Sequence, residues 1–518
     1  MNFNKKAWLL IILSSLLRIW VAASLELGND EVYYQAYARH LQWNYFDHPP
    51  MVAVLIRLST FNLYFQNEFF IRLGSIFCAA AGTWLIFLIG RRIGSARTGW
   101  FAAVLYNTSF YTSIIAGTFI LPDSPQVVCW LMSMYFMIRI LEYRTPDKKQ
   151  WLDFIFLGIS IGLCIMSKIH GVFLLLGFGA YIIFHRRDLL KTPMLWISGI
   201  ISLVIIYPIY YWNRLNHFIT YNYHEGRLRF IGGSPDLDRI LQQVLGSVFY
   251  SNPVNFIIYV LTIWAIIKGK IVRLPVVYPL LLWLSLPLIF VLLWTSMFSE
   301  TLPHWSGPAY LSLMPLAAYW LDEKTEKQSS AKWLKTAGWL YVTVVVMGVF
   351  GIRYLPFRMG SREERNLGKG DITLDMYGWH SFAVSMDSLY KADFESGRMK
   401  ENATIISDYW FPAGHLDHYY SIPYHHNLLA VGPVNDIHHF AWLNQRRPPL
   451  RKGSDAYFIY PSNYYGPPKI SLKNDFALVE DSLRIPQFRS GNPVRYFVVY
   501  RMHDFKRDSL ALIIPGIH

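Results

Sequence analysis

The chain has 518 residues, of which 53% are hydrophobic and only 16% are charged. Apolar stretches of about 18 or more residues recur through its first two thirds, which excludes a soluble globular protein and indicates a polytopic membrane protein. The formal net charge of +14 is concentrated in short loops between these stretches. It is therefore better explained by membrane topology and anionic lipid headgroups than by binding to nucleic acid.

Apolar runs of about twenty residues predict about eleven transmembrane helices. They lie at 7–25, 69–90, 98–117, 125–141, 151–167, 171–184, 193–212, 244–267, 276–297, 309–321 and 339–354. The first run is too long for a signal peptide and lacks a small-residue cleavage site, so we expect it to be retained. Cys78, Cys129 and Cys164 lie inside these runs, where free cysteine behaves as a small apolar residue, and no disulfide is expected.

The charges of the loops predict the orientation of these spans. If Lys5 and Lys6 are cytoplasmic, the loops on their side, at 91–97, 144–149, 185–191, 268–273 and 324–335, are all rich in lysine or arginine. This is the pattern that the positive-inside rule requires. An odd number of spans then places the C-terminal region outside. The loops that carry Asp30, Asp123, Lys168, Arg227 and His304 are outside as well.

The loop at 26–68 concentrates acidic, histidine and aromatic residues, and it is predicted to hold two short interfacial helices. Asn29 can cap the first helix, which places Asp30 and Glu31 in its first turn, where the helix dipole favours negative charge. Helix-terminal acids are one explanation of this pair, and a reaction centre is the other. Since adjacent helical residues point about 100° apart, we expect one carboxylate to face a site and the other to hold the loop.

The second half of this loop contains Asp47-His48-Pro49-Pro50. Each proline fixes its own φ and restricts the preceding residue, so Asp47 and His48 are predicted on a rigid, extended corner. Tyr34 belongs to a set of aromatic residues around them that fits either an interfacial belt or a sugar-stacking surface. The other members of that set are Tyr33, Tyr37, Trp43, Tyr45 and Phe46.

Two later positions combine charge with a helix boundary. Asp123, which lies between Pro122 and Pro125, can be a helix N-cap, a second carboxylate of the site, or both, since capping and substrate contact are compatible. Lys168 interrupts two apolar runs and is either a snorkelling lysine in a tight turn or a cation for a lipid phosphate.

Arg227 and Arg229 could share phosphate binding with bidentate geometry, or anchor the chain at lipid headgroups. His304 and Trp305 are either an interfacial anchor or part of the acceptor cavity. Carboxylate and imidazole groups such as Asp30, His48 and Asp123 suit several divalent ions. Their spacing does not specify a metal site, so the metal ligands are unknown.

From about Arg358 onward the composition changes to short strand-like runs interspersed with polar residues, which predicts a separate small α/β domain. Its strands are expected at 403–407, 428–431, 456–460 and 495–500, and its helices at 379–395 and 411–420. The predicted domains are therefore a transmembrane domain at 1–355, with 27–68 as its catalytic loop, and a soluble extracytoplasmic domain at 356–518.

Several of these motifs together resemble the bacterial membrane glycosyltransferases of the GT-C type, in the group related to protein O-mannosyltransferases, to the aminoarabinose transferase of lipid A and to Rgt-like domains. The matching stretches, in order, are 30–34, 43–51, 121–125, 167–171, 212–213 with 223–224, and 303–305. They span roughly 10–321. One departure concerns His48, because the aminoarabinose transferases look to have a lysine before the Pro-Pro pair.

The resemblance implies a polyprenyl-phosphate-linked sugar donor, reaction on the outer face of the membrane, and a first-loop aspartate as catalytic base or acceptor-orienting group. Carried over, Asp30 is the base, Glu31 supports it, Asp123 assists, and Lys168 meets the donor phosphate. The substrate-binding residues are then expected to be Tyr34, Asp47, His48, His304 and Trp305.

We therefore expect a glycosyltransferase of the bacterial cytoplasmic membrane that glycosylates a hydroxyl of a cell-envelope glycan, glycolipid or protein, with an optional divalent metal. A transporter or lipid-linked-sugar flippase is the alternative, although such proteins usually place ionisable groups near the bilayer midplane. A non-catalytic assembly protein whose external domain binds glycan is a third.

Overall fold

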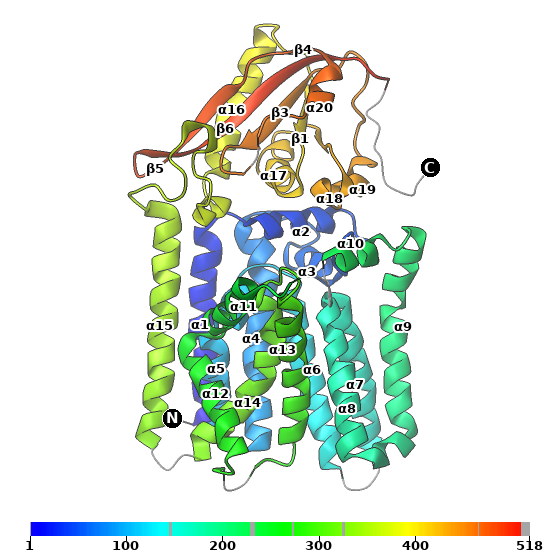
Figure 1. The fold of residues 1–518 in the computed structure, drawn as a ribbon, viewed down its shortest axis with the longest axis vertical. Coiled ribbons are helices and arrows are strands. Elements are labelled where there is room, and N and C mark those ends of the chain that lie inside the picture. Colours follow the sequence, from blue (N-terminus) through cyan, green and yellow to red (C-terminus); the bar gives the residue numbers. More distant parts are fainter. Residues whose placement is uncertain are drawn as a thin grey trace. The chain divides into compact units, whose positions relative to one another are not determined.

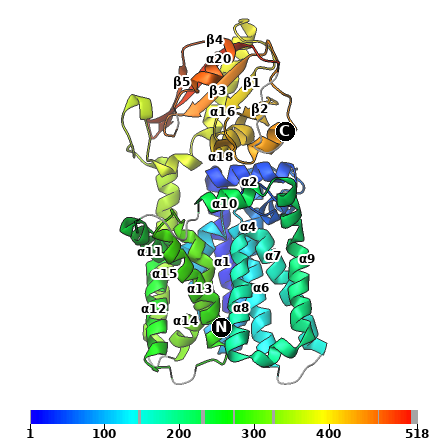
Figure 2. The same cartoon turned by 45° about the vertical axis from the view of Figure 1, so that its right-hand side comes forward.

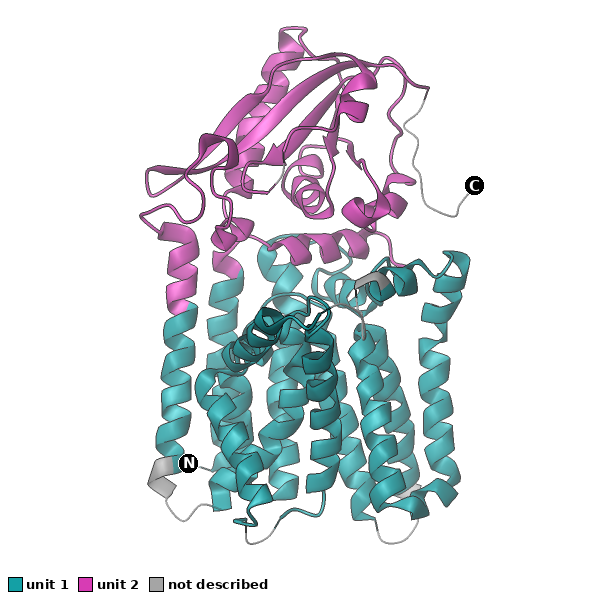
Figure 3. Ribbon diagram, viewed as in Figure 1, with its two compact units in different colours: residues 1–22, 43–345 teal, residues 23–42, 346–518 magenta. Residues whose placement is uncertain are grey.

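The computed structural model describes residues 2–143, 148–227, 234–271, 274–323, 327–464 and 466–508. Contacts between Cα atoms divide the chain into two compact units (Figure 3). The first unit contains residues 1–22 and 43–345, and the second contains residues 23–42 and 346–518.

The first unit is a bundle of long helices (Figure 1). Its α-helices are α1 (Phe3–Ser24), α3 (Met51–Ser59), α4 (Glu68–Ile93), α5 (Ala96–Thr108), α6 (Asp123–Glu142), α7 (Lys148–Ser167), α8 (Val172–His185), α9 (Pro193–Leu215), α10 (Ile219–Arg227), α11 (Leu237–Ser251), α12 (Pro253–Ile267), α13 (Tyr278–Ser296), α14 (Gly307–Glu323) and α15 (Lys327–Tyr354), the last of which continues into the second unit. Its shorter turns are the π-helix η1 (Tyr111–Ile115) and the 3-10 helices η2 (Ile169–Gly171), η3 (Arg187–Lys191) and η4 (Pro303–Ser306). Helix α7 packs between α6 and α9 (Figure 2).

The helices agree with the predicted spans. In the part of the chain that the structure describes, seven helices are long and apolar enough to cross a membrane, or up to eight if a bent pair is one span. Each of the eleven predicted runs contains at least one helix. Three runs hold the shorter helices α5, α8 and α14.

The run predicted at 244–267 is not one straight helix, because α11 and α12 meet at an angle of 103°. Asn252 at the break has φ of 71°, outside the helical region. Pro253 follows it and has no backbone N–H to continue the helical hydrogen bonds. The prediction of a single helix here was wrong, although the Asn-Pro pair was a signal for a break.

Small residues let neighbouring helices of the bundle approach closely. A Cβ atom on Gly90 of α4 would lie 2.8 Å from the Cα atom of Gly99 of α5. Helices inside a membrane associate mainly through such close packing, since burial from lipid provides little hydrophobic driving force. The glycine pair therefore sets the distance between α4 and α5.

The second unit is a mixed α/β domain. Its strands are β1 (Thr404–Ser407), β2 (Leu428–Ala430), β3 (Ala456–Pro461), β4 (Phe476–Val479), β5 (Leu483–Arg489) and β6 (Asn492–Phe505). Its helices are α2 (Asn29–Arg39), α16 (Trp379–Glu395), α17 (Trp410–Leu416), α18 (Val434–Ile437), α19 (Phe440–Asn444) and α20 (Ile470–Asn474), with the π-helix η7 (Asp417–Ser421) and the 3-10 helices η5 (Glu364–Asn366) and η6 (Ile372–Met376).

The sheet has the order β2-β1-β3-β6-β4, with β5 also paired to β6. Strand β1 runs parallel to both β2 and β3, with Ile405 opposite Leu428 and Tyr457. Strand β6 runs antiparallel to β3, β4 and β5. Buried residues such as Ile406, Phe458 and Val498 form the core of this unit.

The four predicted strands and the predicted helix at 379–395 are present, and so are the two short helices of the first loop, α2 and α3. The helix predicted at 411–420 is divided between α17 and η7. Strands β4 and β5 were missed. The predicted boundary at residue 355 and the predicted catalytic role of 27–68 stay predictions.

Candidate functional site

The first unit contains a buried ion pair between Asp123 and Lys168, the two charged residues that were predicted at helix boundaries. Asp123 is the first residue of α6, and Lys168 lies in extended backbone between α7 and η2. The Nζ atom of Lys168 donates to Oδ2 of Asp123 over 2.8 Å, and both side chains are buried. Asp123 makes no side-chain cap of α6, and the buried Lys168 does not snorkel, so both structural alternatives are wrong.

Tyr111 is the third member of this cluster, and it was not predicted from the sequence. Its hydroxyl donates to Oδ1 of Asp123 over 2.9 Å. Tyr111 begins the π-helix η1, a type of turn that is often found at functional sites. A Cβ atom on Gly307 would lie 2.3 Å from Cε1 of the Tyr111 ring. The absence of a side chain at Gly307 therefore leaves the space in which the tyrosine reaches Asp123.

Histidines lie within electrostatic range of the ion pair. Burial lowers the pKa of His48 to about 4, the Asp47 charge opposes this shift, and Lys168 adds to it. Burial and then Lys168 lower the pKa of His304 to about 4 as well. Both imidazoles are therefore neutral at neutral pH, and they can donate or accept hydrogen bonds without adding charge.

Trp305 and His170 extend this cluster, because the centres of their rings are 5.6 Å apart. His170 lies in the short helix η2, directly after Lys168 and Ile169. The 3-10 helix η4 presents His304 and Trp305 together. Four segments of the first unit therefore meet in one region, and they carry predicted site residues: His48, Asp123, Lys168, and His304 with Trp305.

The corner at Asp47 and His48 is held by α10. Its Thr220 hydroxyl donates to the Tyr45 carbonyl over 3.1 Å, and His224 Nε2 lies 3.0 Å from the Asp47 carbonyl oxygen. The Tyr45 N–H donates to the His48 carbonyl over 3.1 Å, which closes a compact bend rather than the extended corner predicted. Pro50 is the N-cap of α3.

Asp30, Glu31 and Tyr34 belong to the second unit. A side-chain oxygen of Glu31 accepts the Gly28 N–H over 2.9 Å, and Gly28 rather than Asn29 is the N-cap of α2. The prediction that Asn29 caps this helix was therefore wrong. Asp30 is exposed, whereas Tyr34 is buried, with its ring 5.5 Å from that of Tyr37.

The two candidate arginines cannot be placed in the site. Arg227 is the last residue of α10, and its side chain lies outside the described part of the chain. Arg229 lies entirely outside the described residues.

Over the ranges that the structure describes, no three His, Cys, Asp or Glu side chains gather to hold an ion. Cys78, Cys129 and Cys164 are free thiols, as predicted.

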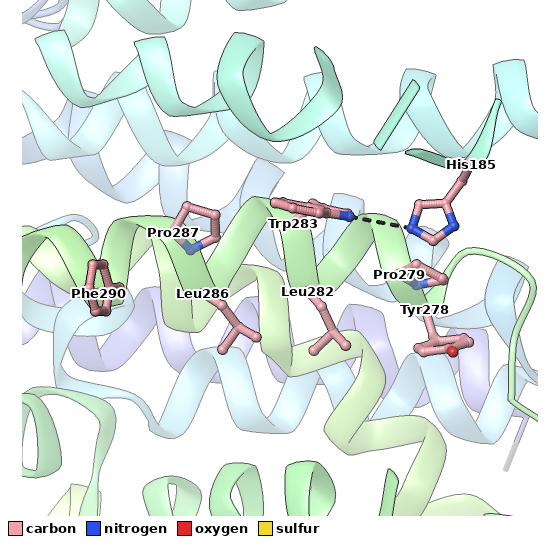
Figure 4. A pocket seen from close by; sticks show the side chains of 8 residues that line it. All are labelled: His185, Tyr278, Pro279, Leu282, Trp283, Leu286, Pro287 and Phe290. Atoms are coloured by element: carbon pink, nitrogen blue, oxygen red, sulfur yellow. Dashed lines mark hydrogen bonds between the residues drawn. The ribbon is translucent and has the colours of Figure 1, made fainter. Parts of the chain in front are cut away.

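A separate pocket of about 490 Å³ runs along α13 beside the end of α8 (Figure 4). Trp283 and His185 line one end of it, with Trp283 Nε1 donating to His185 Nε2 over 3.4 Å, and Phe290 lines the other. Its lining is mostly apolar and contains none of the predicted site residues. This pocket is therefore distinct from the cluster around Asp123 and Lys168.

Known proteins are similar to this chain in part of its sequence and in its fold. Residues 47–212 match the family model described as dolichyl-phosphate-mannose-protein mannosyltransferase. The lipid A galacturonosyltransferase RgtD of Rhizobium johnstonii is 21% identical over 300 residues, which are 58% of this chain and 61% of RgtD. The matched region thus spans about three fifths of that relative's length.

The crystal structure of ArnT from Cupriavidus metallidurans bound to undecaprenyl phosphate superposes with a TM-score of 0.64 at 14% identity. The apo form of the same protein gives a TM-score of 0.63 at 15% identity. Each match covers 96% of this chain and 98% of ArnT. The chain has the fold of ArnT, which is the GT-C fold.

The GT-C fold confirms the predicted class, a polytopic helical membrane protein with a C-terminal α/β domain, and the resemblance read from the motifs. The family match at 47–212 contains Asp47, His48, Asp123 and Lys168. Four of the predicted site residues therefore lie in the part of this GT-C chain where the family similarity was found.

Proposed function

We propose that the chain transfers one sugar from a polyprenyl-phosphate-linked donor to an acceptor hydroxyl. The observation that carries the proposal is the buried Lys168–Asp123 pair with Tyr111 at its side. A phosphate leaving group gains negative charge in the transition state, and a preorganised cation in a water-poor site stabilises that charge strongly. The fold shared with ArnT, which binds undecaprenyl phosphate, supports the same donor class.

In this proposal Lys168 meets the donor phosphate, and Asp123 and Tyr111 hold the lysine in position. His48 and His304 donate hydrogen bonds to phosphate oxygens as neutral imidazoles. They can do so without electrostatic repulsion from Lys168, since neither carries a charge at neutral pH. Arg227 and Arg229 are proposed as additional phosphate ligands with bidentate geometry.

The acceptor oxygen attacks the anomeric carbon while the bond from that carbon to the phosphate oxygen breaks. The polyprenyl phosphate leaves with the electron pair, and the Asp30 carboxylate takes the acceptor proton. A positioned general base of this kind contributes about 10²–10⁴-fold to the rate. Glu31 supports Asp30 by fixing the start of α2, and the configuration at the anomeric carbon is inverted.

Tyr34, Asp47 and Trp305 are proposed to bind the sugar and the acceptor, because aromatic rings stack on sugar faces and a carboxylate accepts sugar hydroxyls. The acceptor belongs to a cell-envelope glycan, glycolipid or protein. The positive-inside pattern supports a bacterial cytoplasmic membrane with the active site and the second unit on the periplasmic side.

The test uses cells that lack the chain, whose envelope glycans and glycolipids are compared with wild type by mass spectrometry. We expect one sugar residue to be missing from one envelope component. Expression of the wild-type chain restores it, whereas Lys168→Met and Asp30→Asn do not. The matched controls are Lys369→Met and Asp481→Asn, because both side chains are exposed.

An unchanged set of envelope glycans in the deletion cells would overturn the proposal. Accumulation of unused lipid-linked sugar at the inner leaflet, with Asp30→Asn fully active, would instead indicate a flippase. Restoration of the glycan by Asp30→Asn alone would remove Asp30 from the mechanism while leaving the donor site at Lys168.

A further inference from the structure

Helix α2, which carries Asp30, is part of the second unit although most of that unit is encoded more than 300 residues later. Figure 3 colours this helix with the C-terminal sheet and its helices. Helix α2 packs against α17 and η7. Asp30, the proposed base, therefore belongs to the same compact unit as the C-terminal domain.

Polar contacts fix the start of this segment. The Leu27 N–H donates to the Tyr419 hydroxyl over 2.6 Å. The Glu26 carboxylate accepts the N–H groups of Trp379 and His380 over 2.8 and 3.1 Å. Both N–H groups lie in the first turn of α16, where a helix offers no acceptor of its own, so Glu26 acts as the cap of a helix distant in sequence.

Further contacts fix the rotation of α2 about its axis. Asn29 Oδ1 accepts a hydrogen bond from His415 Nε2 over 2.9 Å. One turn further on, the Tyr33 hydroxyl accepts the His439 N–H over 3.1 Å. Residues at i and i+4 lie on one face of a helix, so both bonds hold the same face. Asp30, about 100° away, is left exposed.

His415 is suited to a fixed structural bond. Its ring stacks on Trp379 with centres 4.0 Å apart and planes 1° from parallel. Burial and the nearby Arg495 charge lower the pKa of His415 well below its usual value. The imidazole is thus neutral with its proton on Nε2, and Nδ1 has no hydrogen-bond partner among the described residues.

The backbones of the two elements also approach closely. A Cβ atom on Gly414, next to His415 in α17, would lie 3.0 Å from Cγ2 of Val32 and 3.5 Å from the Tyr33 nitrogen. This approach brings the His415 side chain within reach of Asn29. The spacing of α2 from α17 therefore depends on glycine at this position.

We propose that the second unit is the positioning platform of the proposed base, and that His415 is a positioning residue that sets the direction of Asp30 through Asn29. This inference rests on the proposed function, in which Asp30 takes the proton of the acceptor hydroxyl. A rotation of α2 would move the carboxylate from the acceptor, and a misplacement of about 1 Å costs on the order of 10²-fold in rate.

The experiment compares His415→Leu, which removes the donor, with His415→Gln, whose amide can donate to Asn29. Tyr419→Phe removes only the hydroxyl bonded to Leu27 and serves if His415→Leu does not fold. The control is His425→Asn, which replaces an exposed histidine at φ of 60° with a residue that tolerates that conformation.

Three readouts are taken on the purified full chain or on complemented deletion cells. They are hydrogen exchange of residues 29–39, the thermal shift produced by undecaprenyl phosphate, and the amount of the restored envelope glycan. We expect His415→Leu to speed exchange in α2 and to lower the product by about 10- to 100-fold, with the undecaprenyl phosphate shift retained. His415→Gln recovers slow exchange and product together, and the control behaves as wild type.

The inference would be overturned if a folded His415→Leu chain made the wild-type amount of product although hydrogen exchange in α2 is faster. It would also be overturned if His415→Leu lost product and His415→Gln did not restore it. The proposed function is judged separately by Asp30→Asn and Lys168→Met. If those two variants are fully active while exchange in α2 still depends on residue 415, the proposed function fails and the attachment of α2 stands.

Discussion

The Nζ atom of Lys168 and the Oδ2 atom of Asp123 lie 2.8 Å apart, and both side chains are almost completely buried. Removing one partner of a buried ion pair leaves an uncompensated charge and costs about 3–5 kcal/mol, whereas replacing both partners is often close to neutral. The pair therefore affects stability through its charge balance, and in the proposed function it affects catalysis through the lysine cation, so variants can separate the two effects.

Lys168→Met is expected to destabilise the protein by about 3–5 kcal/mol, and the double variant Lys168→Met with Asp123→Asn is expected to lose much less. Thermal unfolding in detergent measures both, with Lys369→Met as the exposed control. Both variants should lack glycan transfer, because each lacks the cation. A double variant no more stable than the single one would show that Asp123 does not carry an unpaired charge.

Gly307→Ala should displace the Tyr111 ring, since the new Cβ atom would lie 2.3 Å from it. Overpacking of this kind costs about 1–3 kcal/mol, and the displaced hydroxyl no longer reaches Asp123. We expect a lower unfolding temperature together with a loss of transfer.

Gly338→Ala is the matched control for Gly307→Ala, because no atom lies within 4 Å of a Cβ added there, inside another helix of the same unit. It should be neutral or slightly stabilising, as alanine favours helices over glycine. Equal unfolding temperatures and equal transfer activity in the two variants would mean that the Tyr111 ring can shift without loss of stability or activity.

Stability should fall on acidification between about pH 6.5 and 4. The pKa values of His48 and His304 are lowered from 6.5 to about 4 by burial. In that window the unfolded chain binds protons that the folded chain does not, so stability rises with pH through it and levels off above. Unfolding temperatures measured from pH 4.5 to 8 test this.

His304→Gln should make that pH dependence shallower, since it removes one of the titrating groups, while His425→Asn in an exposed loop should leave it unchanged. If the slope in His304→Gln equals that of wild type, the acid sensitivity belongs to other groups than the histidine beside Lys168.

Glu26→Ala should loosen the start of α16, because its carboxylate accepts the N–H groups of Trp379 and His380. The loss of a helix cap costs about 0.5–2 kcal/mol. Hydrogen exchange at these two amides is expected to accelerate. Glu401→Ala, which removes an exposed carboxylate in the loop before β1, should leave both amides protected, and acceleration there would point to a general loss of stability.

The sequence predicted the spans of the first unit because their helices carry apolar runs, whereas the short polar helix α10 (Ile219–Arg227) gave no such signal. It predicted β1, β2 and β3 because their residues are buried throughout and mostly apolar. Strands β4 and β5 were missed for the opposite reason. Both carry mostly exposed or half-buried residues, and β5 contains Arg484 and Pro486, a composition that does not favour a strand.

The candidate site was predicted in part. Asp123 and Lys168 stand out because charge is rare beside apolar runs, but their direct bond could not be foreseen from positions 45 residues apart. Tyr111 is one of many aromatic residues, and the sequence around it contains no signal that predicts a π-helix. The place of α2 in the second unit depends on contacts such as Asn29 with His415, for which neither residue type gives a signal.

The attachment of α2 to the second unit also orders the events of biosynthesis. A ribosome makes Asn29 386 residues before His415, so the helix that carries Asp30 cannot dock on α17 until the chain has been synthesised at least as far as His415. A prematurely terminated chain can insert its hydrophobic segments but leaves this helix undocked. Synthesis of α17 and η7 is therefore a condition for docking the helix that carries the proposed base.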